Sequence, residues 1–270
     1  MAVWSALAAG AFSPGVSYRT YRVWQRNRDV FLRLWQAELV WPVVEPILII
    51  TALGLGLGVF VELGGDQSYI EFITPGIMAV YPMWAAISEC AWGAYLRMAM
   101  QRTFDAIIAT PVELEDVIAG EILWGATRSL INTVYILVVA LAFTPAYHLI
   151  DSPLALLVLP LALVHGLMFA SIAMCNTSVA FSLSSLNYFF SLVVTPMFWL
   201  GGVFFPLDEL PEGFQVAAWF LPVTHVVAID RGLVEGELSW GHLGDLAWIL
   251  VVTAVFFRLA IFAMKRRLIK

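Results

Sequence analysis

The sequence predicts an all-α integral membrane protein with six transmembrane helices, because of its composition, its apolar runs and the placement of its charges. Hydrophobic residues make up 61% of the 270 residues and charged residues only 13%, whereas soluble domains contain about 25% charged residues. A helix needs about 20 apolar residues to cross the hydrocarbon core of a bilayer. We therefore expect spans over 39–61, 72–98, 117–143, 154–182, 187–205 and 245–264.

Basic residues lie on one side of the predicted spans. Five arginines precede the first span, Arg97 and Arg102 lie between the second and third, and four basic residues end the chain. Arg231 is the only basic residue in the loops on the other side. Cytoplasmic loops carry an excess of Lys and Arg, so we expect both termini in the cytoplasm. No basic residue precedes the apolar stretch 1–15, and we expect no signal peptide there.

The segment 18–36 is polar in composition but periodic in position. Four of its arginines and Asp29 fall on one helical face, and the opposite face carries Tyr21, Trp24, Phe31, Leu32 and Trp35. This pattern is typical of an amphipathic helix that lies in the membrane interface. Arg28 falls on the apolar side and would have to extend its charge toward water. This helix either has a role in the mechanism of the protein or only anchors the chain to the membrane surface.

A long external segment, 206–242, joins the last two spans. It contains three prolines, and proline stops helices and extends the residue before it. Between them lies the apolar run Phe214–Leu221, which favours two short helical pieces that re-enter the membrane. A folded external cap is the alternative. We interpret the whole chain, 1–270, as a single domain.

The sequence argues against an enzyme. A phosphate-binding loop needs a lysine after glycine, and neither of the two lysines, Lys265 and Lys270, follows one. We expect no catalytic, metal-binding or cofactor-binding residues in this chain. Gly54 and Gly58 form a GxxxG pair inside the first predicted span, which favours close approach of another helix.

Two polar and aromatic stripes are candidates for a translocation path. The second span carries Tyr81, Trp84, Ser88, Trp92 and Tyr95 on one face, and the fifth carries Tyr188, Ser191, Thr195 and Phe198. Aromatic rings and hydroxyls can hold an amphipathic or sugar-bearing molecule by stacking and hydrogen bonding. Ordinary helix packing with an interfacial aromatic belt explains the same pattern.

Ionisable residues within spans are costly and usually face protein or water. Four such residues are Glu45, Glu89, Glu121 and Arg128, and Glu89 lies deepest beside the aromatic stripe. It is either a packing residue or part of the path. Glu121 and Arg128 lie two turns apart on one helical face, where a shared network is conceivable.

The loop 101–116 predicts a short helix over 103–109, ended by Thr110-Pro111. Thr103 is the expected N-cap, and Asp105 suits the first turn. Such a helix, with Phe104, Ile107 and Ile108 exposed, would offer a docking surface. An interfacial helix without a partner is the alternative.

Two sequence blocks resemble a known family. The first lies in Gln101–Glu121, in particular Gln101–Ala106 and Gly120-Glu121, and the second runs from Thr195-Pro196 through Gly201–Pro211, followed by Phe220–His225. The chain resembles the membrane permeases of ABC type-2 exporters, in particular the branch that contains nodulation protein J and related lipooligosaccharide-export permeases.

The resemblance implies a permease homodimer that works with two copies of a separate ABC ATPase, which would bind ATP and Mg. It places a coupling helix at Arg102, Thr103, Phe104, Asp105, Ile108 and Pro111, and a path lined by spans one, two and five. It also implies a bacterial inner membrane location, contact with membrane lipid, an amphipathic glycolipid, lipooligosaccharide or polysaccharide as cargo, and no nucleic-acid partner.

Other functions stay open at this point. Drug and antibiotic exporters share the architecture. A proton-coupled secondary transporter would use Glu89 as its proton site, although no inverted repeat is visible. A lipid-modifying enzyme lacks any catalytic cluster in the sequence.

Overall fold

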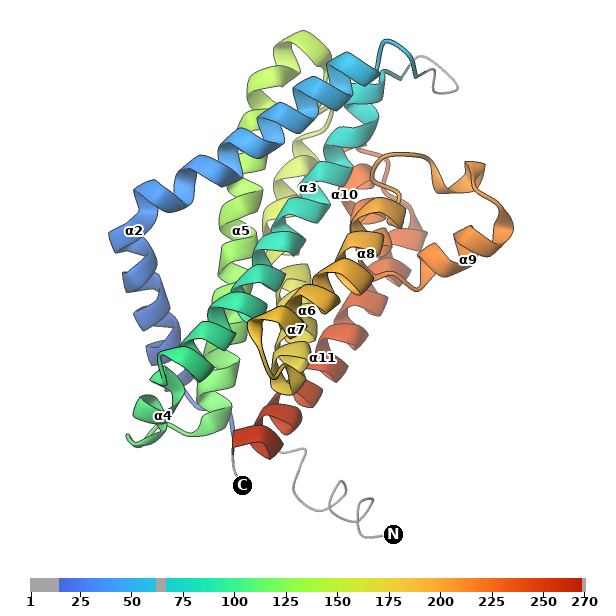
Figure 1. Ribbon diagram of the computed structural model, residues 1–270. Coiled ribbons are helices and arrows are strands. Elements are labelled where there is room, and N and C mark those ends of the chain that lie inside the picture. Colours follow the sequence, from blue (N-terminus) through green and yellow to red (C-terminus); the bar gives the residue numbers. More distant parts are fainter. Residues whose placement is uncertain (1–14, 62–66, 269–270) are drawn as a thin grey trace.

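The computed structural model describes residues 15–61 and 67–268, and every regular element in these ranges is a helix (Figure 1). The expected all-α fold class is confirmed. Most of the N-terminal stretch for which we expect no signal peptide lies outside the described residues. The helices are α2 (Thr20–Ile49), η1 (Ile50–Leu57), α3 (Tyr69–Ser88), η2 (Glu89–Gly93), η3 (Leu96–Met100), α4 (Thr103–Ile108), α5 (Leu114–Tyr147), η4 (Pro153–Leu157), α6 (Val158–Val179), α7 (Leu183–Phe189), η5 (Phe190–Val194), α8 (Thr195–Leu200), η6 (Leu207–Glu209), α9 (Glu212–Trp219), α10 (Pro222–Glu235) and α11 (Trp240–Leu268).

Five described helices are long and apolar enough to cross a membrane, and they coincide with the second to sixth expected spans. They cover 69–100, 114–147, 153–179, 183–200 and 240–268. The helix that corresponds to the fifth expected span, 187–205, ends at Leu200, because Gly202 adopts a left-handed conformation with φ +79°. The first expected span, 39–61, corresponds to a shorter apolar helix over Pro42–Leu57.

The N-terminal helix differs from the prediction of two separate elements, 18–36 and 39–61. α2 runs unbroken from Thr20 to Ile49 and bends along its length (Figure 1). Pro42 and Pro46 lie inside it. Proline is tolerated inside membrane helices when neighbouring groups satisfy the freed backbone. The predicted interfacial helix and the start of the first span are therefore one continuous element.

Part of the apolar face of α2 packs on α5. The Trp24 indole donates to the Thr127 hydroxyl at 2.8 Å, and Phe31 packs edge-on against Trp124 at 5.7 Å. Further along the same face Trp35 remains half exposed. The expectation that this whole face meets headgroups is therefore wrong, since α5 covers a portion of it.

α5 packs on α2, α3 and α6. Small residues allow these helices to approach closely. A Cβ atom on Gly125 would lie 2.8 Å from the Cys90 sulfur, and one on Gly166 would lie 2.7 Å from Ser129 Cβ. The last span, α11, packs mainly on α6.

The segment between the last two spans contains two helices, α9 and α10, bent by 90° at Pro222. The His225 ring is buried against α11, with Nδ1 2.7 Å from Asp245 Oδ1 and its face stacked on Trp248. α10 also packs on α3. A bent pair of this kind is the geometry of a broken span or a re-entrant loop.

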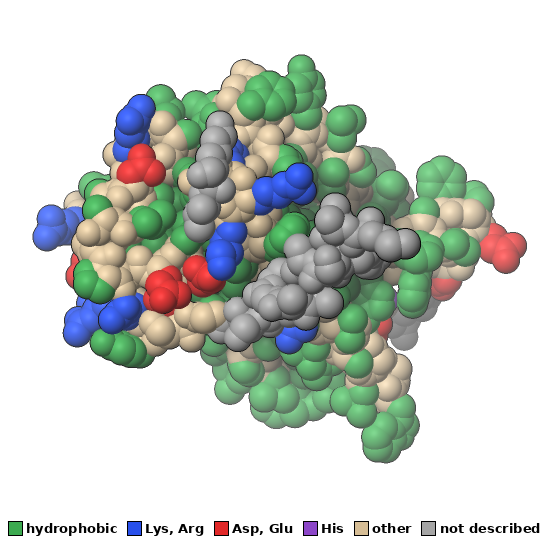
Figure 2. Space-filling model, turned by 90° about the horizontal axis from the view of Figure 1, so that it is seen from below, with side chains coloured by type: hydrophobic (Ala, Val, Ile, Leu, Met, Phe, Trp, Pro, Cys, Tyr) green, Lys and Arg blue, Asp and Glu red, His purple; other side chains and the backbone are tan. Residues whose placement is uncertain are grey.

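One end of the bundle gathers α4, the start of α2 and the end of α11 (Figure 1). Lys265 pairs with Glu115, and Arg19 donates to the Pro111 carbonyl. Seen from this end, the surface carries Lys, Arg, Asp and Glu side chains among hydrophobic ones (Figure 2). Arg19, Arg102 and Lys265, one from each basic group that the sequence placed on one side, thus lie at this end.

The GxxxG pair lies where the first helix meets α3. A Cβ atom on Gly54 would lie 2.6 Å from Ile70 Cγ1, whereas one on Gly56 would meet only a carbonyl of its own helix at 4.0 Å. The close approach that the sequence predicted at Gly54 is therefore present.

We expect Gly54→Ala to lower the thermal unfolding midpoint in detergent, because overpacking a tight contact costs about 1–3 kcal/mol. Gly56→Ala, two residues along the same helix, is the matched control and should leave the midpoint unchanged or slightly higher. Equal midpoints for the two variants would contradict this packing.

Candidate functional site

The short helix α4 sits in the loop between α3 and α5. Arg102 precedes it with a left-handed backbone, φ +50°, and is its N-cap residue. The predicted N-cap, Thr103, is instead the first helical residue, and its hydroxyl lies 3.5 Å from Gln101 Oε1. The sharp turn at Arg102 sets the direction in which α4 leaves α3.

The two faces of α4 differ in exposure. Phe104 is fully buried, so the expectation that it is exposed for docking is wrong. Asp105 and Pro111 are exposed, and Ile108 is 39% exposed. The helix thus uses one aromatic side chain as an anchor in the core and presents the opposite face outward.

A chain of ion pairs crosses the bundle close to α4. Glu38 of α2 lies 2.5 Å from Arg128 of α5, whose Nε lies 3.6 Å from Glu89. Glu89 lies 2.8 Å from Arg97, which also contacts Glu121 at 2.5 Å. We call these five residues the charge network. It joins α2, α3 with its π-helical continuation, and α5.

The network explains three of the four ionisable residues that the sequence places within spans. Glu121 has no exposed side-chain surface, and its carboxylate is neutralised by Arg97. Glu121 and Arg128 belong to one network, as the sequence suggested. They do not pair with each other but are joined through Arg97 and Glu89. A buried charge is tolerated only when it is paired in this way.

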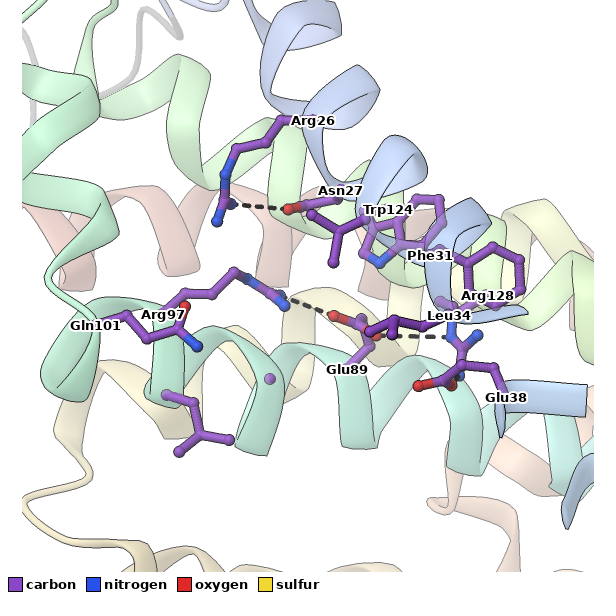
Figure 3. A pocket seen from close by; sticks show the side chains of 13 residues that line it. Arg26, Asn27, Phe31, Leu34, Glu38, Glu89, Arg97, Gln101, Trp124 and Arg128 are labelled. Atoms are coloured by element: carbon purple, nitrogen blue, oxygen red, sulfur yellow. Dashed lines mark hydrogen bonds and ion pairs between the residues drawn. The ribbon is translucent and has the colours of Figure 1, made fainter. Parts of the chain in front are cut away.

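A cavity of about 200 Å³ opens beside the network (Figure 3). Its polar lining comes from α2, from the segment that runs from η2 to Gln101, and from α5. Hydrophobic side chains of α2, with Leu96 and Trp124, form the rest of the wall. We call it the cationic cavity, and its charged and amide residues are Arg26, Asn27, Glu38, Glu89, Arg97, Gln101 and Arg128.

A second cavity, of about 320 Å³, shares Glu89, Gly93 and Arg128 with the first. We call it the aromatic cavity. Four residues of the predicted translocation stripe line it, namely Tyr81, Trp84, Ser88 and Trp92. Glu45, the remaining ionisable residue, lines the same cavity.

Tyr95 departs from the predicted stripe. It is buried, and the Arg267 guanidinium lies 5.9 Å from its ring. The helix is π-helical over Glu89–Gly93. A π-helical turn holds more residues than an α-helical one and rotates the side chains that follow it. The 100° periodicity used for the prediction fails there.

The fifth span brings part of its predicted stripe beside the second. Phe198 packs edge-on to Trp84 with ring centroids 6.4 Å apart. Tyr188 and Ser191 are exposed on the outer side, and Thr195 is half-buried. Phe190, which sequence reasoning missed, stacks flat on Trp92 at 3.8 Å.

Other functional candidates were missed because they depend on pairing across helices. Arg97 lies eight residues after Glu89, and only the π-helical turns bring both to one face. Arg26 was predicted on the polar face of the amphipathic helix 18–36, and Glu38 lies just beyond that helix. The packing of α2 on α5 was not predictable from periodicity alone.

We expect Arg97→Gln to lower stability by about 3 kcal/mol, because it leaves the buried Glu121 carboxylate without a counter-charge. The double variant Arg97→Gln/Glu121→Gln should recover most of that loss. Arg28→Gln, which breaks an exposed pair with Asp29, is the control and should not change the midpoint. Thermal unfolding in detergent measures all three, and equal losses in the single and double variants would refute the pairing.

Comparison with known proteins agrees with this architecture. The family model described as ABC-2 type transporter matches residues 18–233. Nodulation protein J of Rhizobium leguminosarum bv. trifolii is 35% identical and covers 95% of this chain and 97% of its own length. Nodulation protein J of Rhizobium meliloti (strain 1021) is 33% identical, over 94% of this chain and 96% of its own length. Inner membrane transport permease YadH of Escherichia coli (strain K12) is 26% identical, over 76% and 78%.

The family match extends from the start of α2 into α10, so it includes α4, the charge network and both cavities. The resemblance inferred from the sequence blocks is confirmed. With its long apolar helices, the chain is a multi-pass membrane permease that belongs to the ABC-2 type transporter family.

Proposed function

We propose that this chain is the permease subunit of an ATP-driven exporter that moves an amphipathic glycolipid, lipooligosaccharide or polysaccharide out across the bacterial inner membrane. The observation that carries the proposal is the outward face of α4. An ATPase that closes on nucleotide needs a rigid element to push, and α4 is short, exposed on one side and anchored on the other. ATP and Mg would bind to two copies of the partner ATPase.

A movement of α4 would reach the cavities through η3, the helical segment that directly precedes it. η3, which contains Arg97, ends at Met100, and α4 begins at Thr103 and packs on both η3 and α5. A push on α4 would therefore displace Arg97 relative to Glu121 and change the walls of both cavities. Packed helices of this kind shift as rigid bodies.

The aromatic cavity supports an amphipathic or saccharide cargo. Flat rings beside hydroxyls bind sugars by stacking and hydrogen bonding, and the cavity offers Trp84, Trp92, Tyr81 and Ser88. Tyr188 and Ser191 are exposed on the neighbouring α7–η5 surface. In a homodimer these residues would face the path between the two copies.

We expect Asp105→Arg and Ile108→Asp to reduce co-purification of a Walker-motif ATPase from mild detergent, or to uncouple its hydrolysis from transport, by roughly tenfold. Both side chains are on the outward face of α4, so the fold should be preserved. Phe104→Ala is unsuitable as a test, because truncating a buried Phe costs about 3–5 kcal/mol.

Glu212→Arg on α9, which lies far from α4 (Figure 1), makes the same charge change as Asp105→Arg and should have no effect. If no ATPase co-purifies under several mild conditions, and transport responds to an uncoupler but not to an ATPase mutation, the exporter assignment fails. A proton-coupled transporter would then explain the result.

A further inference from the structure

Arg26 stands apart from the other arginines of the cationic cavity. Arg97 and Arg128 each contact carboxylates, whereas Arg26 has no ion pair among residues 15–61 and 67–268. Its guanidinium donates to Asn27 Oδ1 at 3.0 Å (Figure 3). The charges that act on it are those of Glu121 and, more weakly, Arg97. Arg26 therefore lacks the direct carboxylate contact that Arg97 and Arg128 have.

A second donor lies in the same cavity. Asn27 is only 4% exposed, and its Nδ2 atom has no acceptor in the part of the chain that the structure describes. Buried polar groups are nearly always hydrogen-bonded. The Asn27 amide and the Arg26 guanidinium are both donors, and together they call for an acceptor that carries negative charge.

The carboxylates in the wall do not fill this role. Glu89 is held between Arg97 and Arg128, and Glu38 is held by Arg128. Glu121, whose charge also acts on Arg26, is itself held by Arg97. Arg26 is therefore the guanidinium of this wall that contacts no carboxylate among the described residues. An oxyanion beside it would give the Arg26 guanidinium and the Asn27 amide an acceptor.

The remaining wall is apolar and continues onto the exposed side of α2. Val30 and Leu34 both line the cavity and are 49% and 56% exposed. Basic residues beside exposed apolar side chains on one helix fit an anionic headgroup with its hydrocarbon chain. A free anion would use the donors and leave the apolar wall unused.

We propose that the cationic cavity binds the oxyanion headgroup of a membrane amphiphile, with Arg26 and the Asn27 amide as donors and the hydrocarbon chain along Val30 and Leu34. The ligand chemistry is a phosphate or similar oxyanion joined to an acyl chain. This goes beyond the proposed function, because the binding needs neither the ATPase nor ATP. The shared wall with the aromatic cavity places such a headgroup beside the proposed path.

The test uses the purified full chain in phosphatidylcholine nanodiscs, titrated with spin-labelled phosphatidylglycerol or spin-labelled phosphatidylcholine. The motionally restricted fraction measures binding. We expect phosphatidylglycerol to bind in preference to phosphatidylcholine. Arg26→Gln should weaken phosphatidylglycerol binding about tenfold, the loss of one charge-assisted hydrogen bond, and Arg26→Lys should retain most of it.

Arg22→Gln is the matched control. Arg22 is exposed one turn earlier on α2 and donates to Gln25, so its loss removes the same charge without touching the cavity. Equal weakening by Arg22→Gln and Arg26→Gln would overturn the site in favour of general surface attraction. Equal restriction of the two lipids in the unmodified chain would also overturn it.

Competition with inorganic phosphate distinguishes a lipid headgroup from a free oxyanion as the ligand of the cationic cavity. If millimolar phosphate displaces phosphatidylglycerol as well as unlabelled lipid does, the site takes a free oxyanion and the amphiphile assignment fails; weak displacement by phosphate supports it. Loss of ATPase co-purification is scored separately on the same variants. A failure of the exporter proposal would therefore not affect the lipid-binding result. A failure of the lipid-binding proposal would likewise not affect the exporter proposal.

Discussion

Arg97 lies between two carboxylates, 2.8 Å from Glu89 and 2.5 Å from Glu121, inside a bundle whose other contacts are mostly apolar. Because a charge in such surroundings must be paired, this guanidinium fixes the relative positions of α3 and α5. Arg128 extends the same constraint to α2 through Glu38. The positions of both cavities, and the turn that leads to α4, follow from these pairs.

The same arrangement accounts for how a short surface helix can influence the interior. α4 is held to the core by Phe104 and follows directly on η3, which carries Arg97. Its exposed face is therefore linked through η3 to Arg97 of the charge network. Glu89 and Arg97 lie in the π-helical turns of the second span, and Trp92, in the first of these turns, lines the aromatic cavity.

The sequence predicted features that depend on local pattern, namely the long apolar helices, the α4 turn and the close approach at Gly54. It failed where tertiary contacts decide. α2 is continuous because α5 supports it, Phe104 is buried because α4 packs back on the bundle, and Tyr95 is rotated by the π-helical turn. The ion pairs of Arg97 join residues on different helices, and hydropathy carries no information on such pairs.

The central claim, that α4 is the element through which a separate ATPase drives this permease, is tested most directly by photo-crosslinking. A benzophenone side chain at Ala109, exposed at the end of α4, would be activated in intact cells and its partner identified by mass spectrometry. We predict a crosslink to a Walker-motif ATPase, with a yield that changes when nucleotide is depleted. Crosslinks to lipid alone, or to a second copy of this chain alone, would contradict the claim.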